Sequence, residues 1–217
     1  MNKKIVFTLL CFFIGLSFIS CERYPISDLH SIPSPVNSWP YPWYIYDDEL
    51  NTKGAFAPVF WEGSGVADNI DFTCTEHPRG RACIKFDWHP KNGETWCGFG
   101  LASTETPQFP NSSKDMTTSG YTKLKFYIRG TLLSGSKVVI NIPRTDSNGK
   151  TVSKDQVDKI EFYPGDLSAN DWKDCAIVLN QTTKNWNTQY YYISVNIEGP
   201  SSNGATIYLD DIRFVKD

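Results

Sequence analysis

Aromatic rings and hydrogen-bonding side chains recur at alternate positions of three otherwise apolar segments. These residues are Tyr127, Arg129, Asn141, Tyr190, Tyr192 and Asn196. Alternate residues of a β-strand point to opposite faces, so all six would face away from the apolar side. Such rings cover the C–H faces of a pyranose, while amide and guanidinium groups bond to its hydroxyls. If the three segments share one sheet, they predict a concave sugar-binding face; the alternative is an ordinary solvated side of a sheet.

Tryptophans extend this set. Trp88 and Trp186 lie beside polar segments that read as loops, where an exposed ring would favour a ligand role. Trp96 is followed closely by Gly98 and Gly100, and the sequence leaves open whether it lies in the core or contacts a ligand. The chain has seven Trp and eleven Tyr, more than a core of this size tends to use, although strands favour aromatic residues in any case. We therefore count Trp88 and Trp186 as candidate sugar ligands.

Familiar catalytic signatures are missing. The sequence contains no Gly-x-Ser-x-Gly, no His-Glu-x-x-His and no glycine-rich phosphate loop. Glycoside hydrolysis needs only two suitably spaced carboxylates, and Glu62, Glu94 and Glu105 lie in or near expected loops, but nothing in the sequence pairs them. The prediction is a binding protein, with a small glycosidase or lyase as the alternative.

Four cysteines follow Cys21. Cys74 and Cys83 bracket residues 77–80, His-Pro-Arg-Gly, which are typical of a hairpin turn. We predict a cross-strand disulfide between them, because the N-terminal segment described below predicts export and an exported chain meets an oxidising compartment. Cys97 and Cys175 either pair or remain buried thiols. A zinc site is not expected, since no Cys-x2-Cys is present and the three His are scattered.

Strands and turns must position all of these residues. Period-two alternation recurs from residue 43 onward, and no window carries a 3.6-residue apolar stripe. The clearest expected strands are 43–46, 83–88, 96–101, 121–129, 137–142, 158–163, 172–179, 190–197 and 205–215. Segments 83–88 and 96–101 are expected to form a hairpin. The predicted fold class is all-β, an antiparallel β-sandwich.

The N-terminal segment has the pattern of an export signal. Two lysines precede an almost unbroken apolar run over residues 5–19, and Ser20 stands before Cys21. The run is shorter than the ~20 residues of a membrane-spanning helix. The segment resembles a bacterial lipoprotein signal, which implies removal of residues 1–20 and lipidation of Cys21. The alternative is an ordinary signal peptide followed by a chance cysteine.

The next segment, residues 21–42, is rich in Pro and Ser and is expected to be an extended tether, which leaves 43–217 as the domain. Removal of the two lysines near the start gives a formal charge of 19 − 24 = −5. With no basic stripe, nucleic acid is not an expected partner. We expect a lipid anchor to hold the chain in the bacterial cell envelope, at the outer membrane or cell surface.

Several segments together resemble one known group of domains in their order and spacing. They are 44–49 (Tyr-Ile-Tyr-Asp-Asp-Glu), 82–87 followed by 96–101, 121–130, 171–179 and 207–214. They resemble the galactose-binding-like jelly rolls and, within that group, carbohydrate-binding modules of the family 11 type. The resemblance implies a jelly-roll sandwich that binds a polysaccharide, commonly a β-glucan, on one face without cleaving it. It also implies a structural calcium near the chain ends.

Carboxylates suited to such a calcium stand at both ends of the domain. Asp48 and Glu49 near the start would meet Asp211 near the end if the first and last strands are neighbours. Adjacent Asp residues inside the apolar run 207–214 are costly unless a cation or hydrogen bonds compensate them. We therefore predict Asp48, Glu49 and Asp211 as ligands. The alternatives are a solvated bulge and hydrogen bonds to loop amides.

One further alternative concerns the partner. The same sandwich could serve as a protein–protein interaction or adhesion module of the cell envelope. An exposed aromatic patch without polar groups would favour that reading over sugar binding.

Overall fold

The computed structural model describes residues 41–51, 56–61, 69–90, 93–103, 120–143, 157–179, 191–199 and 204–217. All of them belong to one compact unit, Trp39–Asp217. The predicted signal, the lipidation site at Cys21 and most of the predicted tether lie outside the described residues. Within the described part, no helix is long and apolar enough to cross a membrane.

Twelve strands are assigned within these ranges. They are β1 (Trp43–Asp47), β2 (Glu49–Leu50), β3 (Phe56–Trp61), β4 (Ile70–Cys74), β5 (Cys83–Trp88), β6 (Trp96–Ser103), β7 (Lys123–Leu132), β8 (Lys137–Asn141), β9 (Lys159–Phe162), β10 (Lys173–Val178), β11 (Tyr191–Glu198) and β12 (Ala205–Val215). Every strand predicted from alternation is present. The predicted Cys74–Cys83 hairpin implied β4, whereas the short β2 and β3 escaped prediction. β3 contains Pro58, which cannot donate to a ladder, and it lies at a sheet edge where that loss is tolerated.

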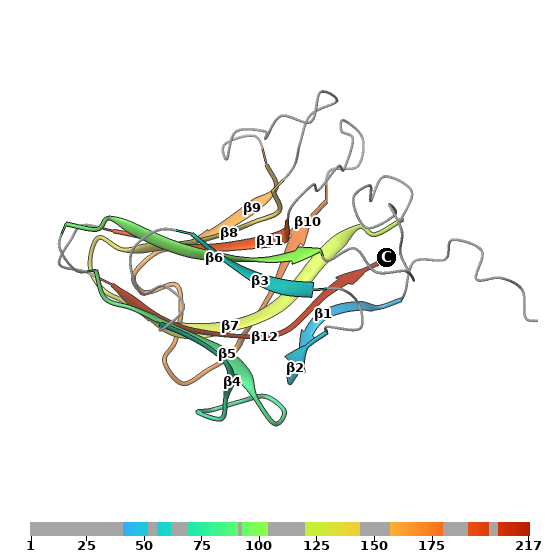
Figure 1. Cartoon of the computed structure of the whole chain (residues 1–217), viewed down its shortest axis with the longest axis horizontal. Coiled ribbons are helices and arrows are strands. Elements are labelled where there is room, and N and C mark those ends of the chain that lie inside the picture. Colours follow the sequence, from blue (N-terminus) through green and yellow to red (C-terminus); the bar gives the residue numbers. More distant parts are fainter. Residues whose placement is uncertain are drawn as a thin grey trace, which may run out of the picture. The chain divides into compact units, whose positions relative to one another are not determined.

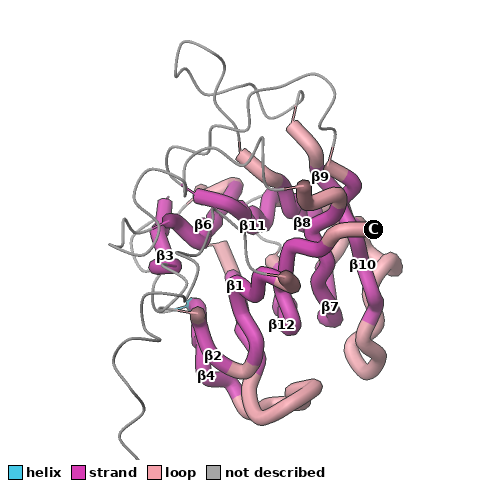
Figure 2. Tube along the Cα trace, turned by 90° about the vertical axis from the view of Figure 1, so that its right-hand side faces the viewer, coloured by secondary structure: helices cyan, strands magenta, loops and turns pink. Residues whose placement is uncertain are grey.

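The strands form two antiparallel sheets that pack face to face (Figure 1). The larger sheet runs β10-β7-β12-β1-β2, with β5 also paired to β12 and β4 paired to β5. The smaller sheet runs β3-β6-β11-β8-β9, and Figure 2 shows its strands side by side in this order. The predicted all-β antiparallel sandwich is confirmed.

The core lies between the two sheets. Leu124, Phe126 and Ile128 of β7 are fully buried, as the alternation of that strand predicts. The rings of Phe86 on β5 and Phe99 on β6 meet edge to face across the two layers, with centroids 5.4 Å apart. Burial of a side chain of this kind contributes about 1.5–3 kcal/mol, so these inner faces supply the main force that holds the sheets together.

Two pairings test the predicted connections. β1 pairs with β12, which confirms that the first and last strands are neighbours. The hairpin predicted from segments 83–88 and 96–101 is wrong: β5 pairs with β4 and β12 in the larger sheet, whereas β6 pairs with β3 and β11 in the smaller one. A turn signal between two alternating strands does not reveal whether the chain returns to the same sheet or crosses to the other.

Candidate functional site

The predicted sugar-binding residues do not share one face. Tyr127 and Arg129 lie on β7 in the larger sheet, whereas Asn141 on β8 and both Tyr192 and Asn196 on β11 lie in the smaller sheet. Because the sheets pack through their inner faces, their outer faces point in opposite directions. The single wall predicted from these residues is therefore wrong. The error arises at the turn after β7, where the chain passes from one sheet to the other.

Tyr127 and Arg129 are occupied by neighbouring protein groups. The Arg79 guanidinium lies 3.2 Å from the centroid of the Tyr127 ring and covers that face. Arg129 is only 5 % exposed, and one of its guanidinium nitrogens donates to the carbonyl oxygen of Ala169. Its guanidinium carbon lies 5.5 Å from the Tyr208 ring centroid. These contacts give both residues a structural role, in place of the predicted contact with sugar.

The tryptophans divide differently from the prediction. Trp88 is 2 % exposed and belongs to the core, so its assignment as a sugar ligand is wrong. It ends β5 at an inward position, which its polar loop neighbours concealed. Trp186 and Tyr190 lie outside the described residues, and for Tyr192 the structure describes only the backbone position on β11. Trp96, which the sequence left open, is 37 % exposed at the start of β6.

The outer face of the smaller sheet brings Asn141 and Asn196 together with residues that the sequence did not single out. Strand register sets three rows across it. The rows are Trp96–Glu198–Lys137, Gly98–Asn196–Val139–Glu161 and Gly100–Ser194–Asn141–Lys159. Tyr163 follows β9 directly and is 49 % exposed. Its hydroxyl donates to Glu161, so it joins the edge of the same face.

Accessibility separates the two ends of this face. Asn141 and Ser194 in the third row and Val139 in the second are 8 %, 4 % and 4 % exposed, whereas Trp96 and Tyr163 are large exposed rings. A ligand can therefore reach the end that carries the first row of residues. We call Trp96, Asn196, Glu198, Lys137, Glu161 and Tyr163 the ring-flanked face.

Ion pairs order the polar side chains of the ring-flanked face. Lys137 Nζ lies 3.2 Å from Glu198 Oε2 and 3.9 Å from Glu161 Oε1, and Lys159 Nζ donates to Glu161 at 3.0 Å. The Tyr163 hydroxyl donates to Glu161 Oε2 at 2.6 Å. The hydrogen bonds from Tyr163 and Lys159 hold the pKa of Glu161 below its ordinary value. The result is a fixed set of donors and acceptors between two rings.

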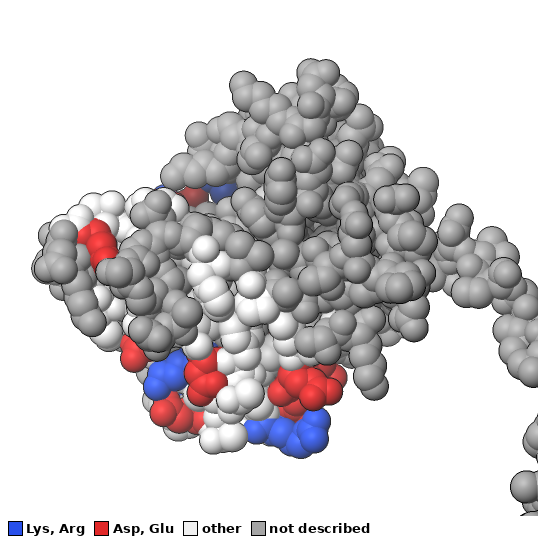
Figure 3. All heavy atoms as spheres, in the orientation of Figure 1, with Lys and Arg blue, Asp and Glu red and all other residues white. Residues whose placement is uncertain are grey.

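The carboxylates predicted to bind calcium are matched to protein donors instead. Asp48 Oδ1 accepts the backbone N–H groups of Arg81 and Ala82, and these bonds lower the pKa of Asp48. Asp211 forms an ion pair with Arg213. Glu49 lies on β2 and is exposed. Acidic and basic side chains accordingly intermingle at the lower edge of Figure 3, where β2 and β4 lie.

These contacts favour the alternative without an ion, and the calcium stays a prediction. In the part of the chain that the structure describes, no three His, Cys, Asp or Glu side chains are grouped closely enough to hold a metal. The neighbouring Asp210, 2 % exposed, accepts backbone N–H groups of Arg79 and Asp211 at 3.2 and 2.7 Å. Asp210 thus accepts two backbone amides, one of them from the loop between β4 and β5, as the alternative considered above expects, whereas Asp211 has its ion pair with Arg213.

Cys74 and Cys83 face each other in the β4–β5 hairpin. They are direct register partners, which confirms the predicted hairpin around them. Both are buried thiols here, and the Cys83 thiol donates to the Cys74 carbonyl oxygen at 3.5 Å. The predicted disulfide is not formed in this structure. Its formation on oxidation stays a prediction, because side chains directly opposed across two strands are close enough to be bridged after small rotations.

Comparison with known proteins shows which solved structures this architecture resembles. No protein-family model matches the chain, and no curated protein matches it. Among solved structures, a family 30 carbohydrate-binding module matches with 13 % identity over 82 % of this chain and 100 % of that chain, at a TM-score of 0.51. Another family 30 module matches with 16 % identity over 81 % and 88 %, at a TM-score of 0.50.

A family 11 module of a cellulosomal cellulase from Clostridium thermocellum is also similar, with 13 % identity over 83 % of this chain and 97 % of that chain, at a TM-score of 0.48. The two family 30 matches show that the chain has the β-sandwich fold of carbohydrate-binding modules. The resemblance found in the sequence is confirmed at the level of the fold.

Proposed function

We propose that this chain is a non-catalytic carbohydrate-binding protein that holds a polysaccharide on the ring-flanked face. The observation that carries the proposal is the pairing of exposed rings with fixed polar groups on one sheet of this fold. Trp96 and Tyr163 offer apolar ring faces, while Asn196, Glu198 and Lys137 offer amide, carboxylate and ammonium groups. A pyranose requires this combination of ring faces and hydrogen-bonding groups.

The geometry suits a chain rather than a single sugar. Trp96 starts β6 and Tyr163 follows β9, with β11 and β8 between those strands. Three strand spacings of ~4.8 Å separate the two rings by about 14 Å across the sheet. A glycan laid across the strands would meet a ring at each end and polar groups between them. A β-glucan is the first ligand to test, since the family 11 resemblance implies one.

On the ring-flanked face, the pKa of Glu161 favours binding over hydrolysis. A glycosidase needs one carboxylic acid with a raised pKa to protonate the leaving oxygen. Glu161 shows the opposite shift, because Tyr163 and Lys159 stabilise its ionised form. The mixture of rings and charges also disfavours the protein-interaction alternative, which calls for an aromatic patch without polar groups.

Affinity electrophoresis of the full chain tests the proposal, with gels that contain mixed-linkage β-glucan, mannan, xylan or pectin. Trp96→Ala should weaken retardation at least about fivefold, the equivalent of one ring contact, while the melting temperature stays nearly constant. Leu133→Ala is the matched control, because Leu133 is 44 % exposed in the turn between β7 and β8. Retardation by none of the four polysaccharides, or equal retardation of Trp96→Ala and wild type, would refute the proposal.

The sequence of residues 1–21 supports a location for this activity. We propose that lipidation of Cys21 anchors the domain in the bacterial cell envelope, at the outer membrane or cell surface, where it would capture glycan. Cys21→Ser should then release the exported protein from the membrane fraction. Unchanged fractionation of that variant would rule out the anchor.

A further inference from the structure

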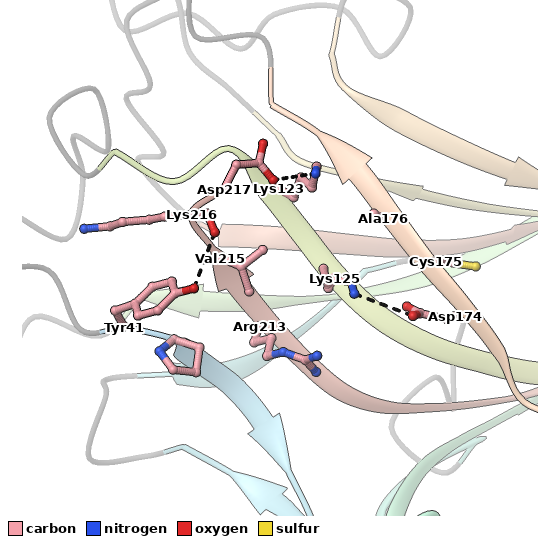
Figure 4. Close-up of a pocket in the computed structure, with 11 residues that line it drawn as sticks. Tyr41, Lys123, Lys125, Asp174, Cys175, Ala176, Arg213, Val215, Lys216 and Asp217 are labelled. Atoms are coloured by element: carbon pink, nitrogen blue, oxygen red, sulfur yellow. Dashed lines mark hydrogen bonds and ion pairs between the residues drawn. The ribbon is translucent and has the colours of Figure 1, made fainter.

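A groove of about 650 Å³ crosses the outer face of the larger sheet, on the side of the sandwich opposite the ring-flanked face. It runs over β10, β7 and β12, and β10 is an edge strand. Ala176, Lys125 and Arg213 stand side by side on these three strands, because Ala176 pairs with Lys125 and Lys125 with Arg213. Figure 4 shows the groove lined by these residues, with Tyr41 beside it.

Three of the four cations that line the groove have an acidic partner. Lys125 Nζ lies 3.5 Å from Asp174 Oδ2 in a cross-strand pair. Lys123 pairs with Asp217, and Arg213 pairs with Asp211. The fourth cation, Lys216, has its ammonium group 5.4 Å from the Tyr121 ring centroid, and its side chain points away from the other lining residues in Figure 4. An anionic ligand that reaches Lys123, Lys125 or Arg213 would have to break these pairs. Dashed lines in Figure 4 mark two of them. The lining therefore complements a neutral ligand with many hydroxyl groups.

The groove also has an apolar part. Tyr41 is 63 % exposed, and its hydroxyl donates to the carbonyl oxygen of Lys216 at 3.4 Å, which steadies the ring beside the groove. Val215 and Ala176 contribute aliphatic surface to the lining. Val178, 67 % exposed, lies in the next row of the same sheet, where it pairs with Lys123. A volume of this size is typical of small-molecule sites.

We propose that this groove is a second saccharide site, which takes a short stretch of a neutral hexose polymer. A sugar ring would lie against Tyr41 with its C–H face, and its hydroxyls would meet the Lys125–Asp174 pair and Arg213. The proposal rests on the proposed function for the class of ligand. The groove itself shares no residue with the ring-flanked face. Two sites on opposite faces would let one molecule bridge two glycan chains or gain avidity on one.

Backbone amide NMR of the full chain tests the proposal. The probes are hexasaccharides of mixed-linkage β-glucan, mannan and xylan, with hexagalacturonate as the anionic probe. A neutral hexasaccharide should shift the amide signals of Ala176 and Val215 as a set separate from those of Trp96 and Glu198. Tyr41→Ala and the groove-filling variant Ala176→Gln should each weaken the affinity measured from the Ala176 and Val215 signals about fivefold or more. Both variants should leave the affinity measured from the Trp96 and Glu198 signals unchanged. Leu133→Ala should change neither.

The outcomes distinguish the two sites. Shifts confined to the neighbourhood of Trp96 would overturn the groove and leave the proposed function intact. Shifts confined to the groove would support the second site and refute the ring-flanked face. Preference of the groove for hexagalacturonate would overturn the neutral class of ligand. Absence of shifts with every probe would overturn both proposals.

Discussion

The contrast between Arg129 and Lys137 shows how neighbours set the task of a side chain. Both are basic residues at outward positions of a strand. Arg129 is 5 % exposed, between the Tyr208 ring and the carbonyl of Ala169, so its donors serve the fold. Lys137 keeps its ammonium group between Glu161 and Glu198 at an accessible end of a sheet. Only the second environment leaves charged groups where a ligand can reach them.

A single substitution can test the hydrogen bond between Tyr163 and Glu161. Its pKa is lowered first by the hydrogen bond from Tyr163, so Tyr163→Phe should move the titration of Glu161 upward, toward the ordinary range. A lowered pKa means that the bond stabilises the fold above the ordinary Glu pKa of 4.5 and that this stability is lost as the pH falls through the folded pKa. For a pair near the surface we expect less than about 1 kcal/mol.

Carbon-13 NMR of the Glu161 side-chain carboxyl measures the midpoint directly. The phenylalanine keeps the ring, so any loss of glycan affinity in this variant should be small compared with Trp96→Ala. An unchanged midpoint would show that the hydroxyl does not hold the carboxylate in solution.

At the scale of elements, the β4–β5 hairpin places Cys74 opposite Cys83. Burial raises the pKa of the Cys83 thiol to about 12, so little thiolate is available and spontaneous oxidation should be slow. We predict that the pair becomes a disulfide when the protein is exported through an oxidising compartment. A loop of this length would gain about 2–3 kcal/mol of stability from closure.

Alkylation followed by mass spectrometry of exported protein checks the bond. Cys97 and Cys175 are buried in different strands and serve as thiols that should be alkylated after unfolding. Detection of alkyl groups on both Cys74 and Cys83 in exported protein would contradict the prediction. Cys83→Ser should lower the melting temperature of oxidised protein and leave that of reduced protein nearly unchanged.

The whole molecule is closed by the pairing of its first and last strands. Asp48 adopts a left-handed backbone conformation, with φ of 58°, directly after β1. Its carboxylate reaches Gly80, where any Cβ would lie 2.2 Å from Asp48 Oδ1. Chain segments far apart in sequence are thus joined by hydrogen bonds at this end of the sandwich, at the place where the resemblance implies calcium.

Treatment with EDTA tests whether hydrogen bonds or a calcium ion hold this end of the sandwich together. Since Asp48, Asp210 and Asp211 already have hydrogen-bond or ion-pair partners, we expect EDTA to leave the melting temperature unchanged. Asp48→Ala should lower it, because two backbone N–H groups near the surface lose their acceptor, and each such bond contributes about 0.5–1.5 kcal/mol. A fall in melting temperature with EDTA that calcium reverses would instead support the ion implied by the resemblance.

The sequence by itself determined the content of each strand. Alternation in β7, β11 and β12 predicted their buried residues, and the spacing of Cys74 and Cys83 predicted the hairpin between them. The order of weak motifs was sufficient to indicate the fold of carbohydrate-binding modules. These features are local or are repeated along the chain, so they can be read without knowing which strands meet.

The tertiary structure alone decided which outward residues share a face. Period-two alternation is the same in either sheet, so nothing local separates Tyr127 from Asn196. Trp88 is different, because it has the parity of Ile84 and Phe86, and the alternation of its strand already indicated an inward position that its polar loop neighbours concealed. Sheet membership follows from pairings between distant strands, such as β6 with β11 and β7 with β12. Those pairings split the predicted wall in two, and they brought Trp96, Lys137 and Tyr163 together.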